Sequence, residues 1–317
     1  MQKPKRKYLK IVNTVLFFIL LSLGTVKNLN AAWQGSGTET DPWQITSRQC
    51  LEALADSVNN ANTYLGEYFI LMNDITDSVR TIIGHQLLDF KGNFEGNDKK
   101  ITSAMNMNTP NPTEIRNASV FHNNKGLVAN LQVDGYAVNH NNHCGSSGIV
   151  SNNYNTVTNC INYATIINYN QIGAHGSGGM VIYNVAGVIS DCINNGMIVG
   201  TNSVGGIAAL NLGNGIIINC MNISMIEGNN NIGGIVGWVS KLVTEMGTVI
   251  NNTNYGFIKG HNNVGGVAGM LFDGATENNF NSGVVEGTSN VGCIVGLNNG
   301  GTVINNHYDK QMCGDED

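Results

Sequence analysis

Charged residues are scarce in this chain, and proline is scarcer still. Only 12% of the 317 residues are Asp, Glu, Lys or Arg, and there are 4 prolines. No basic block follows the first ten residues and the net charge is −6, so the electrostatic footprint of a nucleic-acid-binding protein is missing. A hydrophobic content of 42% excludes an intrinsically disordered chain. We therefore expect a packed protein that does not bind DNA or RNA.

The sequence also lacks the usual signatures of cofactor sites. Its glycines recur throughout instead of standing once at a strand-to-helix turn, so neither a P-loop nor a dinucleotide fingerprint is present. The one cluster of metal-binding residue types is His140-Asn141-Asn142-His143-Cys144, and no second ligand pair follows at zinc-finger spacing. We interpret this segment as a polar loop, with a zinc or copper site as the alternative, and predict no cofactor.

Acidic residues do not gather in the pattern that a glycan-active enzyme requires. Such enzymes place two or more carboxylates, or a basic group beside an acidic cluster, on one face. Glu227 and Glu286 share a repeat position, but Lys259 lies between them. The other acids of the repeats are scattered: Asp191, Glu245, Asp273 and Glu277. The sequence predicts a protein that is not an enzyme, with a β-helix polysaccharide lyase or glycosidase as the alternative.

Residues 1–32 have the pattern of a signal peptide. Lys3 to Lys10 supply a positive start, Ile11 to Leu23 form an apolar run, and Ala31-Ala32 offer a cleavage point. The apolar run is too short to favour a membrane span, although an uncleaved anchor is the alternative. We expect a bacterial protein that is exported, either secreted or held at the cell surface, and not in the membrane once the signal is cleaved.

One short phrase recurs from about residue 155 to residue 306. It consists of glycine, β-branched residues, Asn or Asp, Cys or Asn, a variable residue and Asn, as in Gly215 to Asn222. Its Asn or Asp occupies positions 159, 191, 219, 251, 278 and 305, which are 32, 28, 32, 27 and 27 residues apart. A unit of this length cannot enclose its own core, so the recurrence predicts a stacked array.

Two further pieces alternate with this phrase in each repeat. One contains two glycines, as in Gly233 to Gly237, and the other is a five-residue piece such as Gly256 to Gly260, whose central aliphatic residue should point inward. Three strands and three turns in 27 to 32 residues make one coil of an all-β, parallel β-solenoid. The fold requires the central residues of the third piece to form one interior column: Ile198, Ile226, Ile258 and Val285.

Four segments follow from these patterns. After the signal peptide, residues 33–125 form a lead-in with the first coils, residues 126–308 the regular repeats, and residues 309–317 an acidic tail. In the lead-in, Thr46 and Gln49 have capping-box spacing, and apolar residues follow at helical spacing: Leu51, Leu54, Ala55 and Val58. We expect this helix to cover the apolar end of the array.

Three of the seven cysteines occupy the same repeat position: Cys160, Cys192 and Cys220. On neighbouring coils they would lie about 4.8 Å apart, the spacing of paired strands. We favour a column of small buried side chains, with a disulfide as the alternative. The odd total leaves at least one thiol free unless it pairs between chains.

The Gly-Gly-Ile-Val-Gly phrases, with Gly-x-Val-x-Asn-Asn/Cys-x-Asn between them, resemble the GLUG repeats of bacterial secreted and surface proteins. The lead-in, from Gly35 to Trp43 and from Phe90 to Asn97, is similar to the region that often precedes those repeats. Departures occur at Ser147 and Cys293, which replace glycine in the first and last Gly-Gly pairs, and at Asp98. The resemblance implies a right-handed β-helix, export and an adhesin-like or cell-surface role.

A function as a binding scaffold follows from this interpretation. We expect an adhesin-like solenoid whose long faces bind an extracellular glycan or a host or bacterial surface protein; the alternative outside enzymology is a structural module of a larger assembly. Trp238, Tyr255 and Phe257 are candidates for an exposed aromatic stripe that stacks on sugars, with burial as the alternative.

Overall fold

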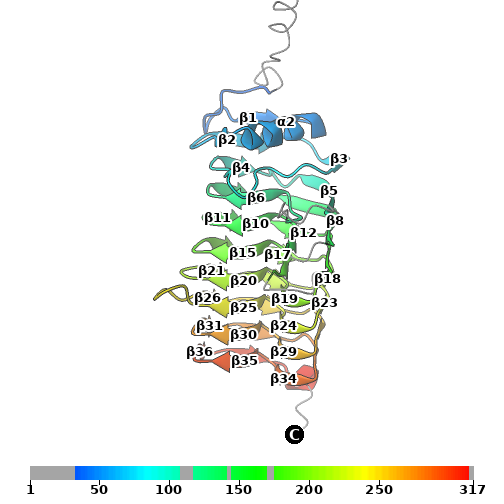
Figure 1. The fold of residues 1–317 in the computed structure, drawn as a ribbon, viewed down its shortest axis with the longest axis vertical. Helices are drawn as coiled ribbons and strands as arrows, with labels where there is room; N and C mark the ends of the chain where they lie inside the picture. The colour runs from blue at the N-terminus through cyan, green and yellow to red at the C-terminus, as the bar shows by residue number, and fades with distance from the viewer. Residues whose placement is uncertain (1–32, 108–116, 141–143, 170–174, 314–317) are drawn as a thin grey trace, which may run out of the picture.

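A parallel β-solenoid forms the protein (Figure 1). The computed structural model describes residues 33–107, 117–140, 144–169 and 175–313, so the predicted signal peptide and the last four residues of the predicted acidic tail lie outside the described residues. The coils stack along one axis, and every pairing between named strands is parallel, as in Ile217↔Val249. No helix among the described residues combines the length and hydrophobicity needed to cross a membrane.

Four sheets make the walls, and we number them in the order in which a coil meets them. Sheet I has ten strands: β1 (Trp43–Ile45), β2 (Tyr68–Leu71), β4 (Asn93–Glu95), β7 (Leu127–Ala129), β11 (Thr156–Thr158), β16 (Val188–Ser190), β21 (Ile216–Ile218), β26 (Thr248–Ile250), β31 (Ala275–Glu277) and β36 (Thr302–Ile304).

Sheet II has fourteen strands, because each regular coil contributes two. It begins with β3 (Ile75–Val79), β5 (Lys100–Met107) and β8 (Gln132–Asn139). One series then continues as β12 (Ile161–Asn162), β17 (Ile193–Asn194), β22 (Met221–Asn222), β27 (Thr253–Asn254), β32 (Phe280–Asn281) and β37 (His307–Tyr308). The other continues as β13 (Thr165–Asn168), β18 (Ile198–Val199), β23 (Ile226–Glu227), β28 (Ile258–Lys259) and β33 (Val285–Glu286).

Sheets III and IV complete each coil. Sheet III consists of β9 (Ser146–Ser147), β14 (Ser177–Gly178), β19 (Asn202–Gly205), β24 (Asn230–Gly233), β29 (Asn262–Gly265) and β34 (Ser289–Gly292). Sheet IV consists of β6 (Phe121–Asn124), β10 (Val150–Asn153), β15 (Val181–Val185), β20 (Ala208–Leu212), β25 (Val236–Ser240), β30 (Ala268–Phe272) and β35 (Val295–Asn299).

A regular coil therefore contains five short strands, not the three that the sequence pattern predicts. The Asn-ended phrase is divided at its Asn or Asp, which adopts a left-handed conformation, with φ of 57° at Asn251. Asn and Asp tolerate that conformation best after glycine, which explains their recurrence there. The Gly-Gly phrase is divided at its glycines, between β24 and β25. The predicted coil length and parallel stacking are confirmed.

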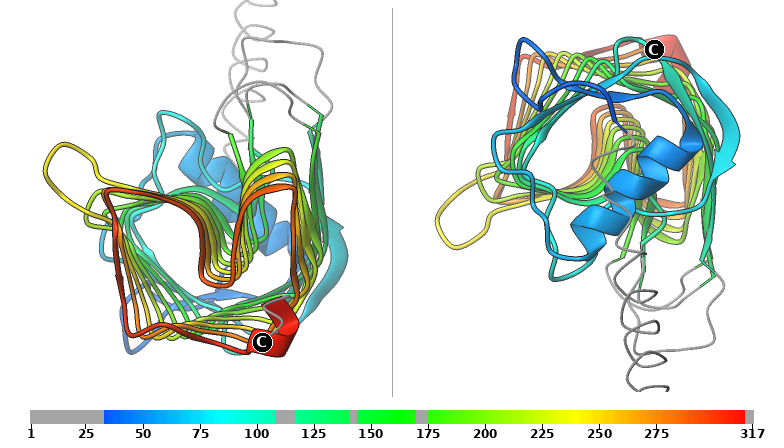
Figure 2. Two further views of the ribbon diagram at one scale, coloured as in Figure 1. Left: turned by 90° about the horizontal axis from the view of Figure 1, so that it is seen from below. Right: turned by 90° about the horizontal axis from the view of Figure 1, so that it is seen from above.

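The wall between sheets III and IV bends into the solenoid as a narrow U (Figure 2). Its two arms touch, because a Cβ added to Gly237 would lie 2.6 Å from the backbone nitrogen of Val204. At the base of the U, a Cβ added to Gly234 would lie 2.4 Å from Cγ of Asn254, which belongs to the opposite wall. Glycine is required at these positions because the backbone itself fills the space.

Aliphatic columns fill the interior. Ile198, Ile226 and Ile258 are fully buried and lie in register on successive coils, as the sequence predicts, and Val285 continues the column. Each such side chain stabilises the fold by about 1.5 to 3 kcal/mol through burial.

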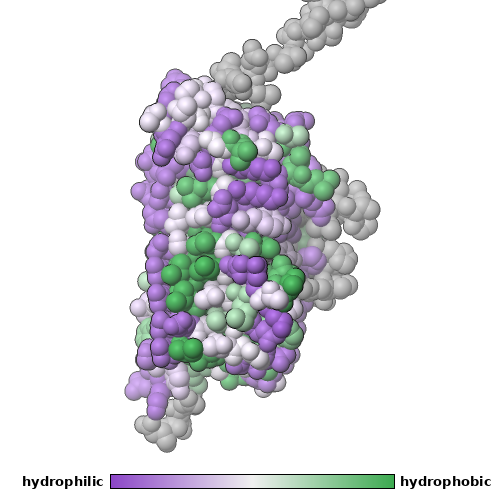
Figure 3. All heavy atoms as spheres, turned by 90° about the vertical axis from the view of Figure 1, so that its left-hand side faces the viewer, coloured by the Kyte–Doolittle hydropathy of each residue, from purple (hydrophilic) through white to green (hydrophobic). Residues whose placement is uncertain are grey.

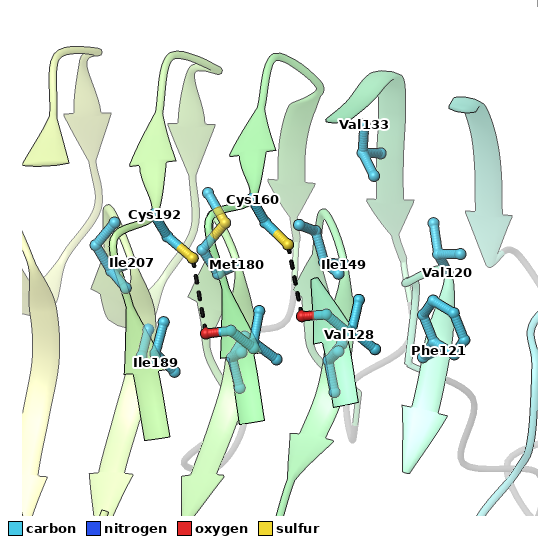
Figure 4. Packing of buried hydrophobic residues seen from close by; sticks show 14 of the residues in the cluster. Val120, Phe121, Val128, Val133, Ile149, Cys160, Met180, Ile189, Cys192 and Ile207 are labelled. Atoms are coloured by element: carbon cyan, nitrogen blue, oxygen red, sulfur yellow. Dashed lines mark hydrogen bonds between the residues drawn. The ribbon is translucent and has the colours of Figure 1, made fainter. Parts of the chain in front are cut away.

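The cysteine column lies within this core (Figure 4). Cys160 and Cys192 donate their thiol protons to backbone carbonyls of the preceding coil, those of Val128 and Val157, with sulfur to oxygen distances of 3.8 Å. Burial raises the pKa of both thiols well above the ordinary value. The three thiols of the column are free in the structure, as expected of small buried side chains.

Buried amides form two long ladders along the stack, as the recurrence of Asn at equivalent positions predicts. In the first, Asn162, Asn194, Asn222 and Asn254 each donate from Nδ2 to Oδ1 of the Asn on the next coil, ending at Asn281, over 2.7 to 2.8 Å. The second ladder, in sheet IV, joins Asn124, Asn153, Asn184 and Asn211 in the same way. Because these side chains are fully buried, each ladder satisfies polar groups that water cannot reach.

Helix α2 (Arg48–Asn59) lies across the N-terminal end of the stack (Figures 1 and 2). Its N-cap is Ser47, whose hydroxyl accepts from the Cys50 amide, so the predicted capping box at Thr46 is wrong by one residue. The predicted apolar side chains of the helix are buried against the first coils. The helix thus shields the open interior at this end from water.

Candidate binding surfaces

The predicted metal-type cluster is not described as a unit, because residues 141–143 lie outside the described residues. Its two ends differ in environment. Cys144 is buried, whereas His140 is exposed and stacks on Tyr169 with 5.0 Å between the ring centroids. Throughout the described parts of the chain, no three or more His, Cys, Asp or Glu side chains gather as metal ligands would.

The scattered acids have neighbours that neutralise or solvate them. Glu227 pairs with Lys259 at 3.7 Å, and Glu286 follows Lys259 in the same column of sheet II. Asp273 pairs with Lys241 at 2.5 Å, and the two residues directly follow strands β30 and β25 of sheet IV. Glu227 and Asp273 therefore lie in surface ion pairs, which differ from the facing pair of carboxylates that glycoside hydrolysis uses.

The three predicted aromatic residues do not form one stripe. Trp238 lies in β25 of sheet IV, whereas Tyr255 and Phe257 lie between β27 and β28 in sheet II. The sequence places Tyr255 only 17 positions after Trp238, but the coil turns through sheet I between them, so the two belong to different walls. The single stripe is therefore wrong, while Tyr255 and Phe257 do share a surface.

That surface is an apolar face on the outside of sheet II. On each coil, three residues at every second position point outward, because residues next to them are buried. The buried residues include Asn222 on one coil and Gly256 and Ile258 on the next. We call this surface the sheet II apolar face; its apolar members are Ile193, Met197, Met221, Ile223, Met225, Tyr255, Phe257, Phe280 and Val284. Successive coils align these residues in columns, as Ile193 and Met221 show; in the same column Thr253 separates Met221 from Phe280.

Several members of the sheet II apolar face are open to solvent. Tyr255 is 51% exposed, Ile223 42% and Met197 40%. The rings of Tyr255 and Phe280 meet edge to face, with 6.5 Å between their centroids. The Glu227–Lys259 pair borders one side. A contiguous apolar surface with a polar border is typical of a protein-binding site. Methionine side chains adapt their shape to a partner, which suits such a surface.

A second hydrophobic region lies on the outer face of sheet I (Figure 3). Its central residues include Ile216, which is 37% exposed, and Ile218 and Ile250. Beside it, the loop between β25 and β26 projects from the corner of the stack (Figure 2). The tip residue, Val243, is 86% exposed with φ of 61°, an unfavourable conformation for a β-branched side chain.

Trp238 belongs to a smaller cluster outside the main core. Its ring packs with Ile182, Ala209 and Leu210 on the outward side of sheet IV. Its Nε1 is buried without a hydrogen-bond acceptor in the structure. The Trp238 side chain is half-buried, so it is neither exposed, as predicted, nor fully buried, as in the alternative.

A buried histidine in the early coils was not anticipated. His122 is buried in β6; its Nδ1 lies 3.1 Å from Oδ1 of Asn123, and its Nε2 has no hydrogen-bond partner in the structure. Asn123 in turn donates to Asp89, which pairs with Lys125 at 2.9 Å. Burial is the largest effect on His122 and lowers its pKa, and the nearby His85 acts in the same direction.

Acid should therefore destabilise the protein through His122. The unfolded chain binds a proton at a pKa of about 6.5, and the folded chain only at lower pH, so this contribution to stability is complete above about pH 6.5 and is lost as pH falls toward the folded pKa. We expect the denaturation midpoint to fall less between about pH 7.5 and 5.5 in His122→Gln than in the parent. The exposed His261, changed to Gln, is the control; an equal effect of both changes would contradict the assignment.

Comparison with known proteins supports the fold. No family model and no curated protein matches the chain. A crystal structure described as "a putative immunoglobulin A1 protease" from Bacteroides ovatus is similar to it, with a TM-score of 0.57 and 17% identity over 86% of this chain and 77% of that chain. At this identity the likeness shows a shared β-solenoid fold alone. Membership of the GLUG-repeat group stays a prediction.

Proposed function

We propose that this protein is an exported, non-enzymatic scaffold that binds an extracellular macromolecule through the sheet II apolar face. The observation that carries the proposal is the exposure of Met197, Ile223, Tyr255 and Phe280 on the outside of sheet II, where successive coils stack in register. Because most members of this face are aliphatic, a protein ligand fits it better than a glycan, whose hydroxyl groups would lose hydrogen bonds to water there.

Rigidity favours this use of the surface. Every strand beneath the face except β33, which pairs only with β28, pairs with the coils on both sides, and the buried ladder of Asn222 and Asn254 braces the same strands from within. Side chains that are already ordered lose less entropy when a ligand binds. The predicted signal peptide supports an extracellular ligand, and the ion-paired acids, Glu227 among them, support a function without catalysis.

A binding screen with matched variants tests the proposal. The chain from residue 33 is applied to arrays of glycans and of purified extracellular proteins, and Ile223→Ser is compared with Ile216→Ser on any ligand found. Both isoleucines lie on the same coil with similar exposure, 42% and 37%, but on different walls. We expect Ile223→Ser and Tyr255→Ser to weaken binding about tenfold or more, and Ile216→Ser to leave it unchanged.

The outcomes separate the surfaces. Loss of binding in Ile216→Ser but not in Ile223→Ser would move the site to sheet I and the loop beside it. Hydrolysis of a glycan or protein by the parent chain would contradict a scaffold without catalysis.

A further inference from the structure

The segment from Ile83 to Phe90 runs along one edge of sheet IV. Strand β6 stands at this edge, and the segment pairs with it in parallel at two places, Ile83↔Phe121 and Phe90↔Asn124. Eight residues of the segment, 83 to 90, therefore span the length of the four residues of β6. The surplus residues leave the edge as a loop, and we call residues 84–89 the edge loop.

One side chain, that of Asn123 in β6, binds the edge loop to the stack. Its Nδ2 donates to the carbonyl oxygens of His85 and Gln86, over 3.1 and 3.3 Å. The same Nδ2 donates to Oδ1 of Asp89 at 3.2 Å. The backbone bonds of the loop run between His85 and Leu88 and do not reach the stack. The loop therefore depends on Asn123 for its position.

Asn123 also fixes the position of the proton on His122. Its Oδ1 accepts from Asn152 at 2.8 Å and lies 3.1 Å from Nδ1 of His122, so Nδ1 is the donor to it. The neutral imidazole carries its proton on Nδ1, and its Nε2 is an acceptor that is buried without a hydrogen-bond partner in the structure. A second proton adds an N–H at Nε2 with no acceptor within hydrogen-bond distance, which leaves a charged group buried and unsatisfied.

The charges of the edge loop do not stabilise a cation at His122. Burial is the largest cause of the lowered pKa of His122, and His85, which is exposed in the loop, acts in the same direction. The acid of the loop, Asp89, already pairs with Lys125 at 2.9 Å and with Lys91 at 4.0 Å. A protonated His122 is therefore less stable under the closed loop than in water.

The edge loop covers the imidazole of His122, and neutral groups flank it along the stack. A Cβ added to Gly84 would lie 3.8 Å from Cβ of His122 and 2.8 Å from the carbonyl oxygen of Leu88. Residues 117–120, which lead into β6, contain no titratable side chain, and the neighbour in β10 is Ser151. The edge loop is the covering element that side chains alone hold, so it is the one that can move to admit water to Nε2.

We propose that protonation of His122 releases the edge loop from the stack at the first coils. The proton enters on Nε2, and water that reaches this atom once the loop lifts accepts the new hydrogen bond. Lifting breaks the three bonds that Asn123 donates and keeps the pairs that Ile83 and Phe90 make at the two ends of the loop. The release is local to sheet IV, so it can hold or fail independently of binding at the sheet II apolar face.

The pH of release follows from the two states of His122. With the loop lifted, the imidazole is in water and binds a proton at its ordinary pKa of about 6.5; with the loop closed, burial lowers that pKa. The closed state is therefore fully favoured above about pH 6.5, and the open state gains as pH falls from there to the closed-state pKa. Between about pH 7.5 and 5.5 the population of open loop should rise about tenfold.

Amide hydrogen exchange tests the proposal, with each rate divided by the intrinsic rate at the same pH to give a protection factor. In the chain from residue 33, we expect the protection of residues 84–89 to fall about tenfold between about pH 7.5 and 5.5, because a lifted turn is not stable in water. Protection in β25, a central strand of the same sheet, should stay constant. Asn123→Ala removes the bonds that hold the loop and should show the low protection already at about pH 7.5.

Two histidine variants separate the source of the effect. His122→Gln cannot gain a proton, so the protection of residues 84–89 should no longer depend on pH, whereas the matched control His85→Gln, in the loop itself, should retain the fall. If His122→Gln does not fold, the ring signals of His122 in NMR spectra of the parent replace it, because they must titrate together with loop opening. Unchanged protection in the parent, a fall that survives in His122→Gln or is lost in His85→Gln, an equal fall in β25, or a ring titration separate from loop opening would each overturn the proposal.

Discussion

Replacing Gly234 with alanine should strongly destabilise the protein, because a Cβ at this position meets atoms of the next coil. The new Cβ would lie 2.2 Å from the carbonyl oxygen of Gly266 and 2.4 Å from Cγ of Asn254. Both neighbours are held by their own coils, so the clash cannot be relieved by a side-chain rotation. We expect the free energy of unfolding to fall by about 3 kcal/mol or more, above the usual range for overpacking.

Gly66→Ala is the control for this prediction. Gly66 has φ of 75°, and a Cβ there would meet nothing within 4 Å, so the change introduces backbone strain without a clash. Its expected cost is about 1 to 2 kcal/mol. Both variants are compared by denaturant unfolding of the chain from residue 33. Equal costs would show that the base of the U is not packed as the structure places it.

Replacing Asn222 with alanine should have the second largest effect. Asn222 accepts from Asn194 and donates to Asn254, both over 2.8 Å, and also donates to the carbonyl of Ser224. Alanine removes one of the two hydrogen bonds made by Nδ2 of Asn194 and one of the two accepted by Oδ1 of Asn254. It also removes both bonds between the Asn222 side chain and the backbone of Ser224. Because each buried unsatisfied group costs about 1 to 3 kcal/mol, we expect a loss of roughly 3 kcal/mol in the free energy of unfolding.

Asn230→Ala is the matched control for the buried ladder. Asn230 also joins two coils through amide bonds, to Asn202 and Asn262 over 2.9 Å, but this ladder lies at the surface. Water can replace the lost bonds there, so the cost should stay below about 1 kcal/mol. If both variants lower the free energy of unfolding equally, burial does not determine how much an amide ladder contributes to stability.

The proposed binding surface is only half visible in the sequence. Tyr255 and Phe257 stand out in the sequence because they are aromatic, whereas Ile223 and Met197 resemble the many other apolar residues of the repeats. A pattern in the sequence marks such residues: Met221 and Ile223 flank the buried Asn222, and Met225 precedes the buried Ile226, so all three point outward. Trp238 and Tyr255 are close in the sequence but lie on different walls, because a solenoid places side by side residues that are one coil apart.

The sequence by itself determined the period of the coil, the aliphatic columns, the left-handed Asn and Asp turns and the helix that covers one end. Each of these depends on local spacing and on neighbours one repeat away, which a regular recurrence records. The tertiary structure alone decided that the wall folds inward at Gly233 and Gly234, that Asn222 faces the interior, and that Trp238 and Tyr255 lie on different walls. These depend on contacts across the coil, between residues whose spacing differs from the repeat, and no periodicity encodes them.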